Sequence, residues 1–110
     1  MQWNSYFHKI GNMETNLAVA QLAALAQENR LAIFRLLVQQ DAAGLAVGQI
    51  AETLGLANAT LSFHLKTLTQ AGLIEARQDG RFIHYSANHA AMHGLLGFLG
   101  ENCCGGKACC

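Results

Sequence analysis

The chain contains no proline, carries no net charge and has no long apolar run, and each absence narrows its fold and function. Without proline, glycine and short polar segments must end every helix and strand. No stretch approaches the roughly 18 consecutive apolar residues that a membrane helix needs, and the N-terminus lacks the basic and apolar parts of a secretion signal. We therefore expect a cytoplasmic protein.

The charge balance argues against a strongly basic nucleic-acid-binding protein. Seven Lys and Arg residues offset seven Asp and Glu residues, so the formal net charge is zero. DNA affinity also depends on local cations, helix N-termini and dimerisation, so this function class stays open. With 110 residues, 52% of them hydrophobic, the chain can form one small domain with a modest core.

Apolar side chains recur at helical spacing along most of the chain. Residues 15–40 predict two helices separated by a short polar segment. A third, short helix is predicted over 47–54, and a glycine ends it. A fourth helix is predicted to begin at Ala57 or Asn58 and to end at Gly72.

The periodicity then changes from that of a helix to that of a strand. Residues 73–77 and 81–85 predict two strands, joined by a turn with an Asp-Gly pair, a common hairpin signal. A last helix is predicted before Glu101. The sequence thus predicts a mainly α-helical domain with a β-hairpin, in the order α-α-α-α-β-β-α. We divide the chain into an N-terminal arm (1–12), a folded domain (13–102) and a cysteine-rich tail (103–110).

The third and fourth helices, with the glycine turn between them, have the sequence form of a helix-turn-helix, and the hairpin would be its wing. The leucines of the fourth helix face the core, which leaves polar and aromatic side chains near its N-terminus for the major groove. Two arginines flank the hairpin turn, where they suit phosphates or the minor groove. The candidate DNA-contacting residues are Asn58, Thr60, Ser62, Phe63, His64, Lys66, Arg77 and Arg81. For His64, a partly buried structural role is an equally good interpretation.

The segment LAVGQIAETLGLANATLSFHLKTLTQAGLIEARQDGRFIHYSA resembles the DNA-reading unit of the ArsR/SmtB family of metal-sensing repressors. The segment ALAQENRLAIFRLL is similar to the family's second-helix signature, with Glu28 where a proline is common. The resemblance implies a winged helix-turn-helix homodimer built from the first and last helices. It also implies a repressor, and not an enzyme, that binds double-stranded operator DNA and releases it when an inducing ion binds. Independently, the glycines at 94, 97 and 100 favour close packing of the last helix against a partner.

Four cysteines, Cys103, Cys104, Cys109 and Cys110, lie within the last eight residues. In a reducing cytosol we expect such thiols to be ligands or reactive groups and not structural disulfides. An adjacent pair with one returning thiol suits the three-coordinate centre of trivalent arsenic or antimony better than tetrahedral zinc. The residues alone leave open which three cysteines bind.

The same segment resembles the inducer site of arsenite-responsive family members, whose ligands follow the last helix. On that resemblance the ligands for As(III), or for Sb(III), are Cys103, Cys104 and Cys110, with Cys109 as the substitute for the third. The family's zinc-type site uses acidic and histidine ligands along the last helix. The residues at the matching positions do not form that ligand set, and they are His89, Ala91, Asn102 and Gly105. We therefore predict a repressor of an arsenic-resistance operon. The alternative is a repressor that senses another thiophilic metal (Cd, Pb, Cu or Zn) or thiol oxidation.

Overall fold

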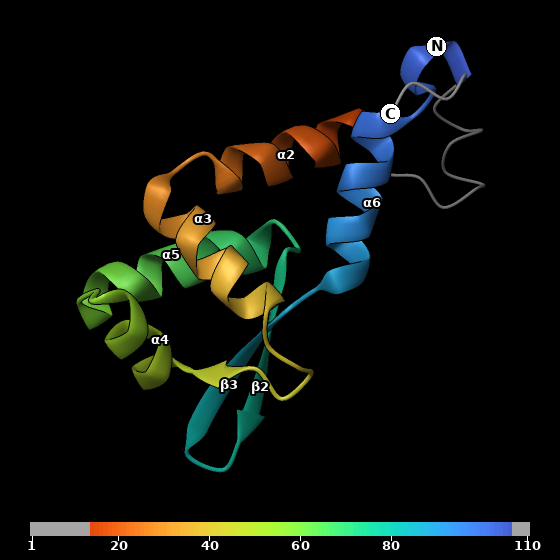
Figure 1. Ribbon diagram of the computed structural model, residues 1–110. Helices are drawn as coiled ribbons and strands as arrows, with labels where there is room; N and C mark the ends of the chain where they lie inside the picture. Colours follow the sequence, from red (N-terminus) through yellow and green to blue (C-terminus); the bar gives the residue numbers. More distant parts are fainter. Residues whose placement is uncertain (1–13, 107–110) are drawn as a thin grey trace.

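The computed structural model describes residues 14–106. Its elements in chain order are α2 (Thr15–Leu25), α3 (Glu28–Val38), β1 (Leu45–Ala46), α4 (Val47–Leu54), α5 (Asn58–Gln70), β2 (Ile74–Asp79), β3 (Phe82–Ala87), α6 (His89–Gly100) and a short 3-10 turn at Cys103–Gly106. In Figure 1 the β2–β3 hairpin projects from one side of the helices, and α6 lies beside α2 at the far end. The predicted mainly helical winged fold is confirmed. The predicted arm, residues 1–12, lies outside the described residues.

The sheet has one more strand than the sequence predicted. The two-residue strand β1 pairs antiparallel with β3, which gives the strand order β1-β3-β2. A strand this short has no periodicity for a sequence pattern to reveal. The hairpin strands also lie slightly later than predicted, with Ile74 opposite Ala87 at one end and Asp79 opposite Phe82 at the other. As a result, Arg81 lies in the turn itself and not in a strand.

The loop before β1 passes very close to β3 at Gly44. This residue has a φ of +69°, and an added Cβ would overlap the carbonyl oxygen of Tyr85. Glycine is the residue that tolerates both the left-handed backbone and the close approach. The absence of a side chain at Gly44 therefore allows the loop before β1 to pack against β3.

One core joins the helix-turn-helix to the sheet. Its largest fully buried side chains come from α3, α4, α5 and the segment that opens β2, and they are Ile33, Leu37, Ile50, Leu61, Leu65, Leu68, Leu73 and Ile74. Three leucines of this set lie on one face of α5, at the helical spacing the sequence predicted. Their burial fixes the rotation of α5 about its axis, and hence which side chains it exposes.

A second, smaller cluster joins the first and last described helices. Ala18 of α2 and Leu95 of α6 are buried against each other, with Leu25 and Phe98 packed beside them. Neither α2, α6 nor any other helix among residues 14–106 has the length and apolar character needed to cross a bilayer. The chain segment that carries the first cysteines continues directly from α6.

Candidate functional site

The N-terminal half of α5 presents an exposed row of polar and aromatic side chains. Asn58, Thr60, Ser62 and Phe63 are all exposed, and Phe63 retains 63% of its accessible surface. Lys66 is exposed one turn further along. These side chains lie opposite the buried leucines, so the face predicted to read bases is open to a partner.

The N-terminus of α5 also has no side-chain cap. The N-cap residue is Ala57, whose side chain accepts no hydrogen bond, so Asn58 is the first helical residue and not the cap. The N–H groups of a first helical turn have no partner within the helix and attract anions. This end of α5 therefore offers donors to a phosphate as well as side chains to bases.

His64 is placed differently from its neighbours. It is only 7% exposed, its Nδ1 lies 3.5 Å from Nη1 of Arg30, and its ring packs edge-on against Phe63 with the centroids 5.8 Å apart. Burial, and secondarily the charge of Arg30, lower the pKa of His64. The expectation that His64 contacts DNA is not supported by this position, because its burial turns it away from the exposed row. It belongs instead to the partly buried structural class that the sequence left open.

The two arginines of the hairpin have separate surroundings. Arg77 is exposed, and its Nη2 donates to the carbonyl oxygen of Ala43 at 3.3 Å, so this side chain folds back along the sheet. Arg81, in the turn, lines a shallow groove of about 270 Å³ between the hairpin and the start of α4. Phe82 lines the same groove and is 63% exposed.

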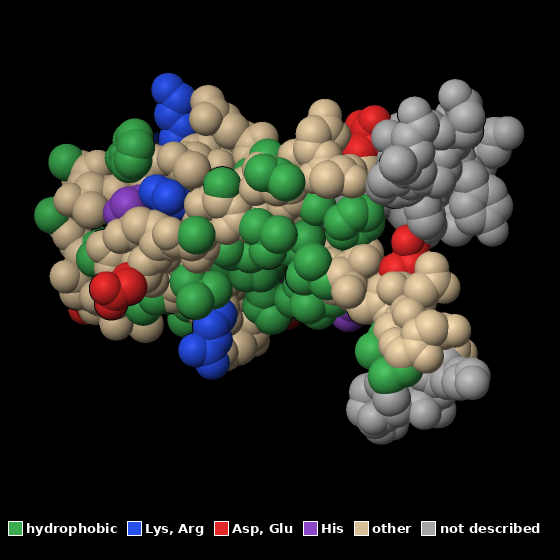
Figure 2. Space-filling model, turned by 90° about the horizontal axis from the view of Figure 1, so that it is seen from above, with side chains coloured by type: hydrophobic (Ala, Val, Ile, Leu, Met, Phe, Trp, Pro, Cys, Tyr) green, Lys and Arg blue, Asp and Glu red, His purple; other side chains and the backbone are tan. Residues whose placement is uncertain are grey.

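A broad apolar surface covers α2 and the outer side of α6. The exposed large hydrophobic residues of these two helices are Leu17, Val19, Leu22, Leu96 and Leu99. The polar residue in the middle of α2, Gln21, is buried and donates to the carbonyl oxygen of Ala71 at 3.2 Å. In Figure 2, hydrophobic side chains gather across the face that contains α2. An apolar patch that joins two helices is typical of a protein–protein interface.

The first two cysteines lie in the 3-10 turn that follows α6. Cys103 and Cys104 are both exposed, their Sγ atoms are 3.9 Å apart, and Cys104 has a φ of 56°. Two thiolates bound to one thiophilic ion at about 2.3 Å each are separated by about 3.8 Å, so this spacing fits chelation. Cys109 and Cys110, the predicted remaining ligands, lie outside the described residues.

Cys104 is disulfide-bonded in the structure, and the expectation that these thiols serve as ligands or reactive groups stays a prediction. Metal binding and oxidation both require sulfur atoms that can approach one another closely, so a thiol cluster supports either. Among residues 14–106, no group of three His, Cys, Asp or Glu side chains gathers into a metal site.

Comparison with known proteins assigns the class. Residues 25–77 match a family described as a helix-turn-helix domain. NolR of Rhizobium meliloti is 34% identical over 88 residues, which is 80% of this chain and 70% of NolR. The cadmium resistance regulatory protein CadC of Listeria innocua is also 34% identical over 88 residues, 80% of this chain and 72% of CadC.

Solved structures agree with these relatives. HlyU from Vibrio cholerae superposes with a TM-score of 0.63 at 35% identity, covering 79% of this chain and 97% of HlyU. The homodimeric winged helix-turn-helix domain Mb0332 from Mycobacterium bovis gives 0.63 at 28% identity, over 86% of this chain and 88% of that domain. A "possible transcriptional regulator for arsenical resistance" gives 0.63 at 29% identity, over 73% and 80%.

The exposed recognition helix, the wing and these likenesses define a winged helix-turn-helix transcriptional regulator. The chain belongs to the ArsR/SmtB family of such regulators.

Proposed function

We propose that this protein is a dimeric repressor that binds two-fold operator DNA and releases it when trivalent arsenic or antimony binds the C-terminal thiols. The observation that carries the proposal is the continuity of the chain from sensor to dimer surface. The turn with Cys103 and Cys104 directly follows α6, and α6 packs on α2 through Leu95 and Ala18. An ion that gathers the thiols therefore acts on the helices that would set the spacing of two reading heads.

The DNA-binding half of the proposal rests on the exposed row of α5 and on the wing. Asn58 can pair with adenine through two hydrogen bonds, Thr60 and Ser62 can contact bases or phosphates, and Phe63 can contact a thymine methyl. Lys66 and Arg81 supply local positive charge in a chain whose net charge is zero. In a two-fold dimer the two copies of α5 would enter major grooves about one helical turn apart.

The dimer half rests on the apolar surface of α2 and α6. Leu22 and Leu96 remain 41% and 58% exposed in the isolated chain, which favours burial against a second copy. The structurally similar Mb0332 domain is homodimeric. We place the two-fold axis at this surface because it leaves α5 and the wing open.

The sensing half rests on the thiol cluster and its chemistry. Cys103 and Cys104, together with Cys110 or Cys109, would supply the sulfur ligands. Regulators similar to this chain include one for cadmium resistance and one for arsenical resistance, which supports a thiophilic inducer. A coupling of about 1–3 kcal/mol between the two sites would weaken DNA binding about 5- to 150-fold.

A second candidate signal is thiol oxidation, which the disulfide at Cys104 favours. In that case a peroxide would take two protons and two electrons from two thiols and become two molecules of water. The disulfide would then strain or release the turn after α6 without any metal.

Competition between inducers tests the proposal. A rhodamine-labelled duplex is first selected from a random-sequence pool by the reduced protein, and release of that duplex is followed by anisotropy. We expect arsenite to release it at lower concentration than Cd²⁺, Zn²⁺ or peroxide, and Cys103→Ser and Cys104→Ser to abolish the response. Serine at Cys109 and at Cys110, one at a time, identifies the third ligand. If only peroxide releases the duplex, the protein senses oxidation and not arsenic. If none of the four substitutions changes release of the duplex, the proposal of a thiol sensor is refuted.

A further inference from the structure

The guanidinium group of Arg30 connects three helices at the back of the recognition helix. Its Nε donates to the carbonyl oxygen of Ala24, at the C-terminal end of α2, at 2.7 Å. Its Nη1 lies 3.5 Å from Nδ1 of His64 on α5, and its backbone N–H donates to Oε1 of Gln27, the N-cap of α3, at 3.0 Å. One half-buried side chain thus ties the proposed dimerisation helix to the proposed DNA-reading helix.

The contact with Arg30 favours a neutral His64 with its proton on Nε2. An arginine has donors and no acceptor, so Nδ1 of His64 must accept from Arg30 and the ring proton must be on Nε2. A second proton would convert Nδ1 into a donor and place two cations 3.5 Å apart beside the core. The contact is therefore weakened when His64 is protonated.

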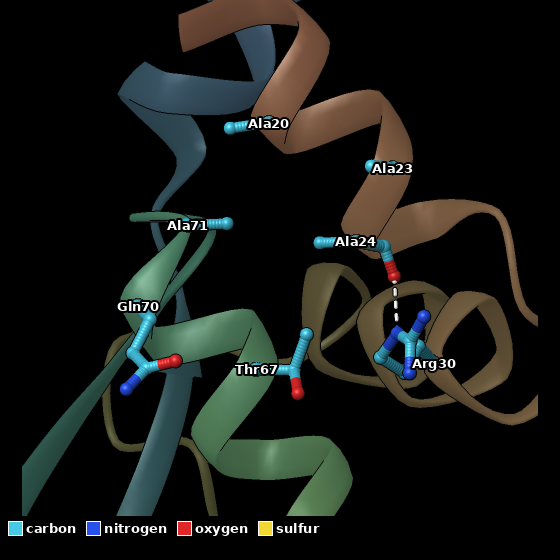
Figure 3. Close-up of a pocket in the computed structure, with 7 residues that line it drawn as sticks. All are labelled: Ala20, Ala23, Ala24, Arg30, Thr67, Gln70 and Ala71. Atoms are coloured by element: carbon cyan, nitrogen blue, oxygen red, sulfur yellow. Dashed lines mark hydrogen bonds between the residues drawn. The ribbon is translucent and has the colours of Figure 1, made fainter.

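An open groove lies beside this contact. It has a volume of about 340 Å³, and its walls carry mostly small side chains, which are Ala20, Ala23 and Ala24 of α2 and Thr67, Gln70 and Ala71 at the end of α5. Figure 3 shows the two walls facing each other, with Arg30 at one end and its bond to Ala24 drawn. Small residues provide little packing across the groove, so polar contacts such as those of Arg30 and Gln21 contribute much of what joins the two helices there.

We infer that the contact between Arg30 and His64 holds α5 in its DNA-binding position, and that protonation of His64 releases it, so that acid weakens operator binding. Arg30 and His64 are positioning residues, because neither lies in the exposed row. The inference rests on the proposed DNA-binding function and adds a second, proton-driven input to it. Release has room to occur, since Arg30 borders the open groove.

Among residues 14–106, Arg30 is the charged side chain in contact with His64. Of the elements packed on α5, α2 has no charged residue, and Arg30 of α3 is the charged side chain that faces His64. The remaining charged residues of α3, α4, α5 and β2 are exposed, and they are Glu28, Arg35, Glu52, Lys66, Glu75, Arg77 and Asp79. The lowered pKa of His64, caused first by burial and then by Arg30, agrees with a neutral ring at pH 7.

The test is the pH dependence of DNA affinity. The full-length protein selects a rhodamine-labelled duplex from a random pool at about pH 7.5, and its dissociation constant is then measured down to about pH 5.5. We expect affinity to fall as the pH is lowered across this range, because protonated His64 loses its contact with Arg30. His64→Asn, whose Oδ1 replaces Nδ1 as an acceptor and does not titrate, should give a flat profile. His93→Asn removes an exposed histidine of α6 and should leave the profile of the parent protein unchanged.

A second variant keeps the inference testable if His64→Asn does not fold. Arg30→Met should weaken binding at neutral pH and should flatten the profile, because the contact that protonation of His64 would break is already absent. Thermal melting at each pH separates lost folding from lost positioning. A wild-type profile that His64→Asn leaves unaltered, or full affinity of Arg30→Met at pH 7.5, would overturn the inference. Failure of the wild-type protein to select any duplex would instead overturn the proposed function.

Discussion

Substitution of Gly44 by alanine measures how tightly the wing is held to the body of the domain. At this position the φ of +69° costs an alanine about 1–2 kcal/mol. The new Cβ would also overlap the Tyr85 carbonyl, so β1 and β3 must separate, at an overpacking cost of about 1–3 kcal/mol. The free energy of unfolding should therefore fall by about 2–5 kcal/mol, which for a domain of this size lowers the melting temperature by about 10–25 °C.

The assay is thermal and urea unfolding followed by circular dichroism at one fixed protein concentration, because dimerisation makes stability concentration-dependent. Gly48→Ala is the matched control, since Gly48 lies in the first turn of α4 and an added Cβ would meet nothing within 4 Å. It should leave stability unchanged or raise it by up to about 1 kcal/mol. Equal stability of the two variants would refute the close approach at Gly44.

Three further predictions address the dimer, the DNA interface and pH. Leu22→Glu or Leu96→Glu should convert the dimer to a monomer in sedimentation equilibrium, whereas Leu31→Glu, exposed on α3 outside the apolar surface, should remain dimeric. A dimeric Leu22→Glu variant would contradict the assigned interface. Asn58→Ala removes a contact of about 1–3 kcal/mol from each of two half-sites, so it should weaken binding to a selected duplex about 30-fold or more in anisotropy titrations, and Gln70→Ala at the far end of α5 should not. Stability should fall as the pH drops below the ordinary histidine pKa of 6.5, because the unfolded chain then binds a proton that folded His64 resists. Urea midpoints that do not change with pH below 6.5, or that change equally in His64→Asn, would count against that explanation.

The fold was largely predictable because its strongest signals are local. Leucines at helical spacing and a glycine at each end define α5, and the Asp-Gly pair defines the hairpin. The exposed row on α5 follows from the same periodicity, since burying Leu61, Leu65 and Leu68 turns Asn58 outward. Where the environment of a residue depends on its position along one helix, the sequence was sufficient to predict whether that residue is buried or exposed.

Contacts between distant segments account for what sequence reasoning missed. Strand β1 forms because Gly44 lets its loop approach β3, a pairing that spans some 40 residues of chain. His64 lies on the buried face of α5 with Leu61, Leu65 and Leu68, so its burial follows from helical periodicity, whereas its contact with Arg30, 34 residues earlier, does not. Contacts between segments far apart in the sequence leave no periodic pattern from which they could be predicted.

The central claim is that the thiol tail and the DNA-reading helix are coupled, and the most direct test measures that coupling from the sensor side. The affinity of the reduced dimer for arsenite is determined by calorimetry with and without a saturating selected duplex. Because linkage is reciprocal, the duplex should weaken arsenite binding by the same factor, about 5- to 150-fold, by which arsenite weakens DNA binding. Equal arsenite affinity in the free and DNA-bound protein would contradict the account.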